Sequence, residues 1–261
     1  MIPKNIHIIW WQKFANLPEH LRPKVQSIID KNPEWKIYLW DEESIRKVMA
    51  QHGPQYLAKM DEFRFLHQSV DLSRFFLLHL FGGVSVDTDV VALKGFDETP
   101  HLQDSDFIVS ANSSSAFENW VKNGKSFSLN NSTILVSQNH PIMKGLLDHI
   151  MGLSCDVTQR KESCIQHTTG PKEFTAYLDQ YKDQIKILNH NVFEPCGGQD
   201  DWGCDIPPEA ILDHQHEGSW ISDRNKQIAH AWYWLKAHWL WIVGIVGFIL
   251  LISFSRKTTT S

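Results

Sequence analysis

The sequence predicts an α/β fold, in which a mostly parallel sheet carries helices on both faces. Three observations indicate this class. Short apolar segments, typical of buried strands, alternate with longer segments whose apolar residues recur at helical spacing. The length of 261 residues allows one domain with a sizeable core, or two small domains. Hydrophobic residues make up 42% and charged residues 21% of the chain, which is typical of a globular protein.

The first third of the chain is predicted to alternate strands and helices. In chain order, the predicted elements are a strand at 5–10, a helix at 18–31, a strand at 36–40, a helix at 42–51, a short helical turn at 55–60, a long helix at 69–80 and a strand at 84–86. Asp41 stands where a side chain caps the helix that follows it. The pair Gly82–Gly83 ends the long helix, and the next strand leads directly into Asp87.

The middle of the chain is predicted to complete the sheet. The predicted elements are strands at 107–110, 133–136, 186–188 and 192–193, and helices at 141–151 and 171–181. A polar region at 195–220 follows and is expected to consist mainly of loops. Because strands alternate with helices through most of this length, the sheet is expected to be mostly parallel.

Four cysteines occur as two local pairs, Cys155/Cys164 and Cys196/Cys204. Neither pair has the close C-x-x-C spacing of zinc or redox sites. Two interpretations stay open at this point. The pairs are either short-loop disulfides formed in an oxidising compartment or free thiols in a reducing one.

The C-terminal region differs in composition from the rest. Residues 237–255 carry no formal charge and, as a helix, would extend about 28 Å, close to the roughly 30 Å of a bilayer core. Aromatic residues crowd the start of this segment, as they do at membrane interfaces. The alternative is a buried core helix. We expect a transmembrane helix here, and hence a single-pass membrane protein with a C-terminal anchor. The sequence does not decide on which side of the membrane the rest of the chain lies. The expected organisation is a globular domain at 1–222, a juxtamembrane linker at 223–236, the membrane helix at 237–255 and a polar tail at 256–261.

The charge balance argues against a nucleic-acid partner. The net charge is −5, the isoelectric point is about 6.3, and no run of Lys and Arg occurs. Binding to the phosphate backbone requires a basic surface. We therefore expect no nucleic acid among the partners.

Two aspartates carry the clearest chemical signal. Asp87 and Asp89 follow a short apolar strand at i and i+2, so their side chains point to the same side of an extended segment. They lie at the carboxyl edge of the sheet, where α/β folds bind ligands. Paired carboxylates suit Mg²⁺ or Mn²⁺, which can bridge the phosphates of a nucleotide. On the preceding helix, Asp71 and Arg74 share a face. The alternatives are a solvated turn for the first pair and a surface ion pair for the second.

Around these residues the sequence resembles a known enzyme family. The segment 70–74, the segment Gly82–Gly83–Val84 and the run Asp87-x-Asp89-Val90 are similar to the central signature of the DXD-containing glycosyltransferases of family 32. This family includes yeast outer-chain and inositol-phosphoceramide mannosyltransferases. Further similarities, in the family's order, are the opening segment 2–10, Asn131 followed by His140–Pro141, Thr169–Gly170–Pro171, and His214-x-His216-x-Gly218–Ser219–Trp220. Together they cover residues 2–220.

The resemblance implies a GT-A fold with a Rossmann-like nucleotide-binding sheet, so that residues 1–222 form the catalytic domain. It also implies that the anomeric configuration of the transferred sugar is retained. The site residues that it implies are Asp71, Arg74, Asp87, Asp89 and Asn131 for catalysis; Ile9, Trp10, Asp71, Arg74, Asp87, Ser219 and Trp220 for the donor; and Asp87, Asp89 and His216 for Mn²⁺ or Mg²⁺. His214 is the other candidate for the metal ligand assigned to His216. The alternative for Trp10 is that it is an ordinary tryptophan of the core.

The identity of the substrates stays open in the sequence. Family members use GDP-mannose, UDP-galactose or UDP-glucose as donor, and a glycan, glycoprotein or glycolipid as acceptor. Ser85 stands where many members carry Tyr, which leaves the donor undecided. Two other classes of function compete with transfer. The first is a nucleotide-sugar hydrolase or a family member that only binds its ligand, and the second is a phosphatase or nuclease that uses the same carboxylates.

Overall fold

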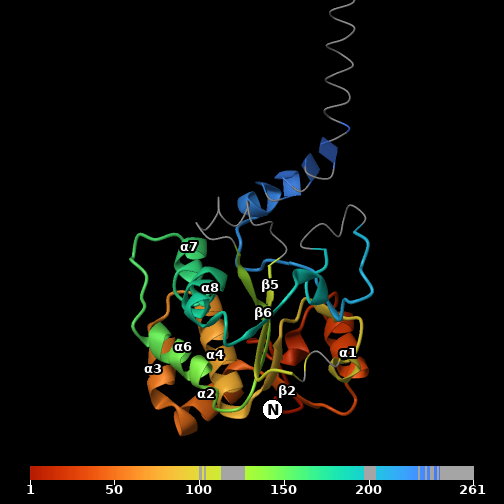
Figure 1. Cartoon of the computed structure of the whole chain (residues 1–261). Helices are drawn as coiled ribbons and strands as arrows, with labels where there is room; N and C mark the ends of the chain where they lie inside the picture. Colours follow the sequence, from red (N-terminus) through yellow and green to blue (C-terminus); the bar gives the residue numbers. More distant parts are fainter. Residues whose placement is uncertain are drawn as a thin grey trace, which may run out of the picture.

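The computed structural model describes residues 1–99, 102, 104–112, 127–196, 204–228, 230–232, 234, 235, 238, 239 and 241. In this part of the chain, a six-stranded sheet forms the centre of the fold, with the order β2-β1-β3-β6-β5-β7 (Figure 1). The strands are β1 (Asn5–Ile9), β2 (Lys36–Trp40), β3 (Gly83–Val86), β5 (Phe107–Ala111), β6 (Leu129–Val136) and β7 (Lys186–Leu188).

The sheet is mixed but mostly parallel, as expected, because five of its six described strands run in the same direction and β6 runs opposite to them. β1 runs parallel to both β2 and β3, and β5 runs parallel to β7. β6 runs antiparallel to both of its neighbours, β3 and β5.

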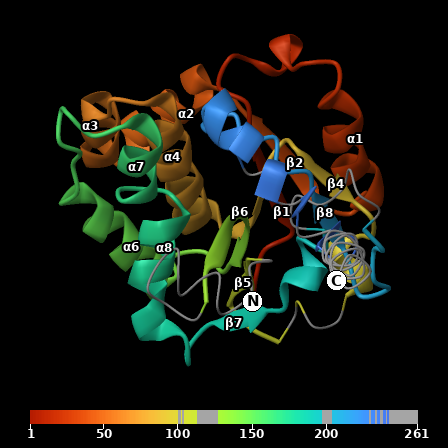
Figure 2. The same ribbon diagram turned by 90° about the horizontal axis from the view of Figure 1, so that it is seen from above.

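Helices cover both faces of the sheet (Figure 2). One face is covered by α2 (Glu42–His52), α3 (Pro54–Glu62), α4 (Leu66–Phe81), α6 (Pro141–Met151) and α8 (Pro171–Leu178). The other face packs against α1 (Arg22–Lys31) and a small sheet of β4 (Val90–Ala92) and β8 (Leu212–His214). Side chains along each strand alternate between the two cores: in β6, Ile134 and Val136 face the first core and Leu135 faces the second.

Two consecutive glycines let the chain pass from α4 into β3 without a gap. Gly82 and Gly83 have φ angles of 62° and 108°, which favour glycine strongly over other residues. A Cβ on Gly83 would collide with the backbone oxygen of Asn5, because β3 lies directly beside β1. This tight junction places the end of β3, and the aspartates after it, at the edge of the sheet.

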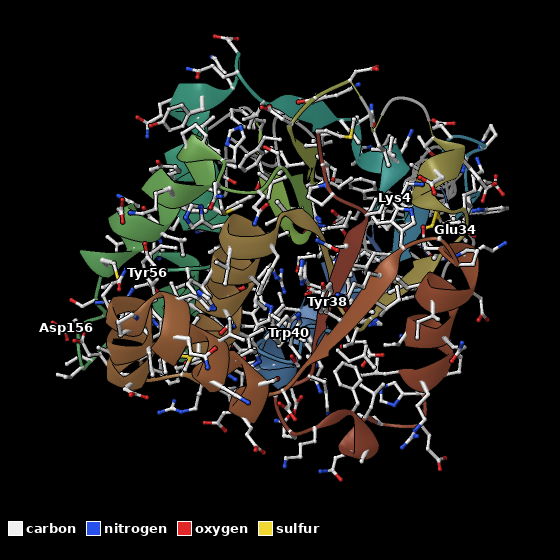
Figure 3. The ribbon with its side chains drawn as sticks, turned by 90° about the horizontal axis from the view of Figure 1, so that it is seen from below. Lys4, Glu34, Tyr38, Trp40, Tyr56 and Asp156 are labelled. Carbon is white, nitrogen blue, oxygen red and sulfur yellow. A yellow bond between two sulfur atoms is a disulfide. The ribbon has the colours of Figure 1, made fainter. Side chains whose placement is uncertain are left out.

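On the α2–α4 face, β1 carries a buried histidine that is bonded on both ring nitrogens. Trp40 Nε1 donates to His7 Nδ1 at 3.0 Å, and His7 Nε2 lies 2.9 Å from the carbonyl oxygen of Gly82. The first bond requires Nδ1 to accept, so the proton is on Nε2 and the ring is neutral. Tyr38 and Trp40 lie on the neighbouring strand β2 (Figure 3). Their rings stack with that of His7.

Most of the predicted elements are present, with shifted ends. The short turn expected at 55–60 is the complete helix α3. The strand expected at 192–193 is wrong: Val192 ends a 3-10 helix (His190–Val192) whose N-cap Asn189 accepts a bond from the amide of Asn191. Of the strands and α-helices in the described part of the chain, β4, β8 and α7 (Lys161–Gln166) were not predicted.

Both cysteine pairs are disulfides. Cys155 is bonded to Cys164 and Cys196 to Cys204, with Cα–Cα separations of 5.4 and 5.5 Å. The first bridge ties the loop after α6 to α7, and the second follows the 3-10 helix His190–Val192. Of the two readings that the sequence left open, the structure adopts the disulfide.

The prediction of a transmembrane helix at 237–255, and with it a single-pass protein with a C-terminal anchor, is wrong. Among the described residues, no helix is sufficiently long and apolar to cross a membrane. The expectation of a membrane as partner rested on this helix and is left without support. Residues 237, 240 and 242–255 of the range, and the tail at 256–261, lie outside the described residues.

Candidate functional site

A cavity of about 1000 Å³ opens at the edge of the sheet where β1 and β3 end and β6 begins. Its lining comes from α4, the turn after β3, the start of β6 and the segment 214–221. All the site residues predicted from the sequence line this cavity: Ile9, Trp10, Asp71, Arg74, Asp87, Asp89, Asn131, His216, Ser219 and Trp220. The fold therefore brings together residues that lie up to 211 positions apart in the sequence, from Ile9 to Trp220.

The small sheet joins the two aspartates to the C-terminal part of the domain. β4 begins directly after Asp89 and pairs with β8 so that Val90 lies opposite His214. The amide of Gln215 donates to the Asp89 carbonyl oxygen at 3.1 Å, and the amide of Glu217 donates to Asp89 Oδ2 at 3.0 Å. This pairing holds residues 214–217 against the turn that contains the aspartates.

As a result, His214 lies beside the aspartates. His214 Nε2 is 3.4 Å from Asp89 Oδ2, and single ligand atoms of Asp87, Asp89 and His214 all lie within 4.8 Å of one another. Although burial opposes both effects, the His214–Asp89 contact lowers the pKa of Asp89 and raises the pKa of His214 to about 9. The sequence favoured His216 as the third metal ligand. The structure places His214 at this position and turns His216 toward Glu194.

The inner wall of the cavity is a network of buried polar groups. Arg74 donates from Nη2 to Asp87 Oδ1 and from Nη1 to the carbonyl oxygen of Asn131. Asp71 accepts from Asn131 Nδ2 at 3.2 Å and from Thr169 Oγ1 at 3.0 Å. Burial raises the pKa of Asp71 to about 7, against the opposing effect of Arg74. Burial also raises the pKa of Asp87, again opposed by Arg74. The network fixes Asp87 relative to α4 and β6.

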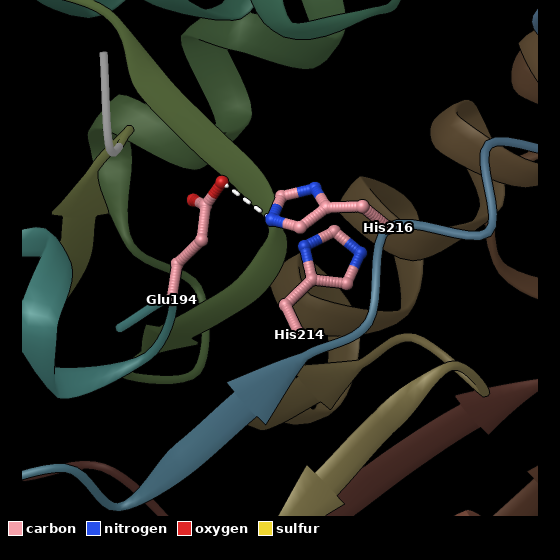
Figure 4. Close-up of side chains that lie close together, drawn as sticks. All are labelled: Glu194, His214 and His216. Atoms are coloured by element: carbon pink, nitrogen blue, oxygen red, sulfur yellow. Dashed lines mark ion pairs between the residues drawn. The ribbon is translucent and has the colours of Figure 1, made fainter. Parts of the chain in front are cut away.

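Glu194 belongs to this cavity and was not singled out in the sequence. It is fully buried, and its Oε2 accepts from Asn130 Nδ2 at 2.6 Å. Its Oε1 lies 2.9 Å from His216 Nε2 (Figure 4). A signal was present, because Glu194 follows the apolar pair Val192–Phe193 much as Asp87 follows β3. A search for carboxylates that directly follow a short apolar segment would have identified both Asp87 and Glu194.

Apolar and aromatic side chains also line the cavity. Ile9 ends β1, and the amide of Trp10 donates to the carbonyl oxygen of Trp40. The hydroxyl of Ser219, another lining residue, lies 3.2 Å from His67 Nε2, and Trp220 follows it. A cavity lined by both apolar and charged groups suits a ligand with a flat ring at one end and anionic groups at the other.

The chemistry of the inner wall suits a hard divalent cation. Two carboxylates and an imidazole are ligands of Mn²⁺ and Mg²⁺ sites, with oxygen donors in the majority. Asp89 is ionised and the three ligand atoms already converge, so the residues present fit such an ion. Without a cation, His214 provides the positive charge next to Asp89.

Part of the chain matches a protein-family model. Residues 18–108 match the model of the glycosyltransferase sugar-binding region containing a DXD motif. This segment includes α4, β3 and the two aspartates, and it ends before Asn131, Glu194 and His214.

Similar proteins are named as glycosyltransferases. An uncharacterized glycosyltransferase of Acanthamoeba polyphaga mimivirus is 24% identical over 227 residues, which are 84% of this chain and 84% of that protein. Inositol phosphoceramide mannosyltransferase 3 of Schizosaccharomyces pombe is 27% identical over 142 residues, 54% of this chain and 35% of that protein. Inositol phosphoceramide mannosyltransferase 2 of the same yeast is 36% identical over 89 residues, 34% of this chain and 25% of that protein. The matches thus span about a third or less of these two mannosyltransferases.

Solved structures give a consistent result for the fold. Mouse xyloside xylosyltransferase 1 superposes with a TM-score of 0.50 at 12% identity, over 84% of this chain and 99% of that chain. The UDP-bound glycosyltransferase domain of the YGT toxin also has a TM-score of 0.50, at 8% identity, over 84% of this chain and 82% of that domain. These likenesses concern the fold alone, and they agree with the GT-A type of architecture expected from the sequence.

Proposed function

We propose that this chain, a glycosyltransferase related to the DXD-containing family, moves a hexose from a nucleotide sugar to an acceptor hydroxyl with the help of a divalent cation. The observation that carries the proposal is the convergence of Asp87, Asp89 and His214 beside Arg74, at the inner end of a cavity with an aromatic wall. In this arrangement the charged groups can bind the diphosphate of the donor, and the aromatic residues can bind its base.

In this proposal each wall of the cavity binds one part of the donor. Ile9 and Trp10 contact the base, and Ser219 and Trp220 contact the diphosphate. The donor sugar then lies near Asp71 and Asn131. Their mutual hydrogen bond of 3.2 Å leaves further lone pairs and an N–H for sugar hydroxyls.

Asp87, Asp89 and His214 would hold the divalent cation. When bound, the cation supplies positive charge against the negative charge that develops on the leaving diphosphate. Arg74 keeps Asp87 in position and adds a fixed positive charge at the same end of the cavity. These groups are ordered before the substrate arrives, so little reorganisation accompanies the reaction.

For the transfer step we propose retention of the anomeric configuration. The acceptor hydroxyl attacks the anomeric carbon from the face that the diphosphate leaves. The bond from the anomeric carbon to the diphosphate oxygen breaks, the new bond to the acceptor oxygen forms, and the hydroxyl proton passes to the departing diphosphate. No side chain is required as a nucleophile in this route.

The donor is proposed to be GDP-mannose, with UDP-galactose and UDP-glucose as the other candidates. The names of the yeast relatives support mannose, and they make an inositol-containing glycolipid the first acceptor to test. The proposal is tested by incubating the protein with each donor and Mn²⁺, followed by thermal shift and by measurement of released nucleotide. Nucleotide release that does not increase with acceptor would indicate a hydrolase and not a transferase.

The first prediction concerns Asp89. Replacing Asp89 with Asn removes the charged ligand that pairs with His214, so transfer should fall by at least about 100-fold, as when a group that stabilises transition-state charge is lost. The measurement is initial transfer rate against Mn²⁺ concentration. The exposed Asp205, replaced with Asn, serves as the matched control and should keep wild-type activity. Near-normal turnover of Asp89→Asn would contradict the proposed function.

A further inference from the structure

Glu194 is a buried carboxylate whose hydrogen bonding is incomplete. Its exposed fraction is 0%, and its Oε2 accepts one bond from Asn130 Nδ2. Its other oxygen, Oε1, receives no hydrogen bond from any residue that the structure describes. A carboxylate removed from water carries a large desolvation cost unless a cation offsets it. Glu194 therefore requires a positive partner on the side of Oε1.

His216 occupies that side as an ion-pair partner. His216 Nε2 lies 2.9 Å from Glu194 Oε1, yet within the described part of the chain neither atom takes part in a well-formed hydrogen bond. Two ligands of one ion are expected at about this separation. With bonds of about 2.1 Å and angles between about 90° and 109°, ligand atoms lie roughly 3.0–3.4 Å apart. The short distance, without a well-formed hydrogen bond, thus fits two ligands that converge on a cation.

The backbone at His216 supports this interpretation independently. His216 has a φ angle of 48°, in the left-handed region that a residue with a side chain occupies rarely. Such conformations concentrate at functional sites. The strained residue directs its imidazole to Glu194 and places it against the ring of His214, with a centroid distance of 4.1 Å and an interplanar angle of 36°. Single ligand atoms of Glu194, His214 and His216 all lie within 4.8 Å of one another.

We propose that Glu194 and His216, with His214 shared, form a second cation position next to the one at Asp87 and Asp89. Two imidazoles and one carboxylate suit a borderline ion such as Zn²⁺, whereas the position with two aspartates suits Mn²⁺ or Mg²⁺. A neutral imidazole binds an ion through one nitrogen, so the two positions compete for His214. When both are occupied, Glu194 and His216 hold the second ion and solvent oxygens complete its shell.

The inference relies on the proposed function only in taking Asp87 and Asp89 as the first position, and its test requires no turnover. Full-length protein is freed of metal with a chelator and titrated with Mn²⁺, with free Mn²⁺ followed by electron paramagnetic resonance. The Mn²⁺-loaded protein is then titrated with Zn²⁺ by calorimetry. The wild type should bind one Zn²⁺ without releasing Mn²⁺.

Variants should separate the two positions. Glu194→Gln should weaken Zn²⁺ binding by more than about tenfold, the least effect expected for a lost ligand, and leave Mn²⁺ binding intact. Asp89→Asn should do the reverse, and His214→Asn should weaken both Mn²⁺ binding and the binding of Zn²⁺ to Mn²⁺-free protein. His216→Asn, at a less buried position, repeats the test in case Glu194→Gln does not fold, and the exposed Glu209→Gln is the matched control.

Two results would overturn the second position. One is displacement of Mn²⁺ by Zn²⁺ in a one-to-one ratio in the wild type. The other is Zn²⁺ binding by folded Glu194→Gln and His216→Asn proteins with wild-type affinity. Failure of the transferase assay would leave these titrations unaffected, so the two proposals can fail separately.

Discussion

Two buried titratable side chains give the protein opposite responses to pH. Burial raises the pKa of the Asp71 carboxyl to about 7, so the folded protein keeps a proton that the unfolded chain loses near pH 4. The free energy of unfolding contributed by Asp71 must therefore fall as the pH rises from about 4 to about 7. A carboxyl of this kind also remains partly protonated near neutral pH, where it can both donate to and accept from a sugar hydroxyl.

We predict that Asp71→Asn removes this fall in stability. The amide can still accept the bond from Thr169, and it does not ionise. Urea unfolding at intervals between pH 5 and 8, in the presence of a chelator, should show a flatter profile for the variant than for the wild type. Asp205→Asn, at an exposed position, should leave the profile unchanged. An unchanged slope in Asp71→Asn would show that the carboxyl is ionised in the folded protein throughout this range.

His7 should have the opposite effect. Burial lowers its pKa to about 4, although the bond to Gly82 opposes this, so the folded protein resists a proton that the unfolded chain takes up near pH 6.5. Stability from the neutral ring is complete above about pH 6.5 and is lost as the pH falls, by roughly 3 kcal/mol at pH 4. We predict that His7→Gln shows a smaller loss between pH 6.5 and 4.5 than the wild type. His52→Gln, at an exposed position, should reproduce the wild-type loss.

At the scale of single elements, the α4–β3 junction depends on the absence of a side chain. We predict that Gly83→Ala destabilises the fold by roughly 1–3 kcal/mol or more, because it combines a positive φ angle with a collision against the β1 backbone. Gly152→Ala is the matched control: its φ is −83°, and a Cβ there meets only the carbonyl oxygen of His149 at 3.5 Å. Thermal unfolding of both variants tests the prediction. Equal melting temperatures would contradict it.

The elements that the sequence predicted share a physical cause. Strands β1, β2 and β3 are mostly apolar, and apolar residues recur at helical spacing over the length of α4, so composition and spacing identify these elements. β4 and β8 have three residues each, too few for a period to show. The first half of β6 is buried but polar, because Asn130, Asn131 and Ser132 face the cavity or bond to one another, and a hydrophobicity pattern does not reveal this.

The same limits apply to the site. Asp71, Arg74, Asp87 and Asp89 follow from local spacing, because a helix face and a strand end are local properties. The choice between His214 and His216 is not local. Two residues at i and i+2 look equivalent in an extended segment, and the pairing of Val90 with His214 decides which one meets Asp89. Register between distant strands is set by tertiary packing.

At the scale of the whole molecule, the disulfides connect loops to the core. Cys155–Cys164 contacts α4 through Gln68, whose Nε2 lies 3.4 Å from Cys155 Sγ and 2.8 Å from Thr168 Oγ1. Thr169, next in the chain, is the residue that bonds to Asp71. The bridge therefore supports one side of the cavity from outside.

We predict that replacing Cys155 and Cys164 together with Ser lowers the free energy of unfolding by roughly 2–3 kcal/mol, since the bridge closes a short loop in the unfolded chain. Chemical denaturation measures the change. A mild reductant should destabilise the wild type more than the double variant. In the double variant, the bridge Cys196–Cys204 is the one disulfide of the described residues that the reductant can still break. Equal stability of variant and wild type would contradict the prediction.

The pairing of β4 with β8 also determines what a shortened version of this protein would be. A product that ends before Leu212 keeps all of residues 18–108, so a family search would still classify it as a glycosyltransferase. It lacks the strand that holds Asp89 in register, and with it His214, Ser219 and Trp220. Under the proposed function, such a product lacks one of the three groups proposed to hold the cation. The two aspartates alone are therefore insufficient to mark an active copy, and the His-x-His segment is the better marker.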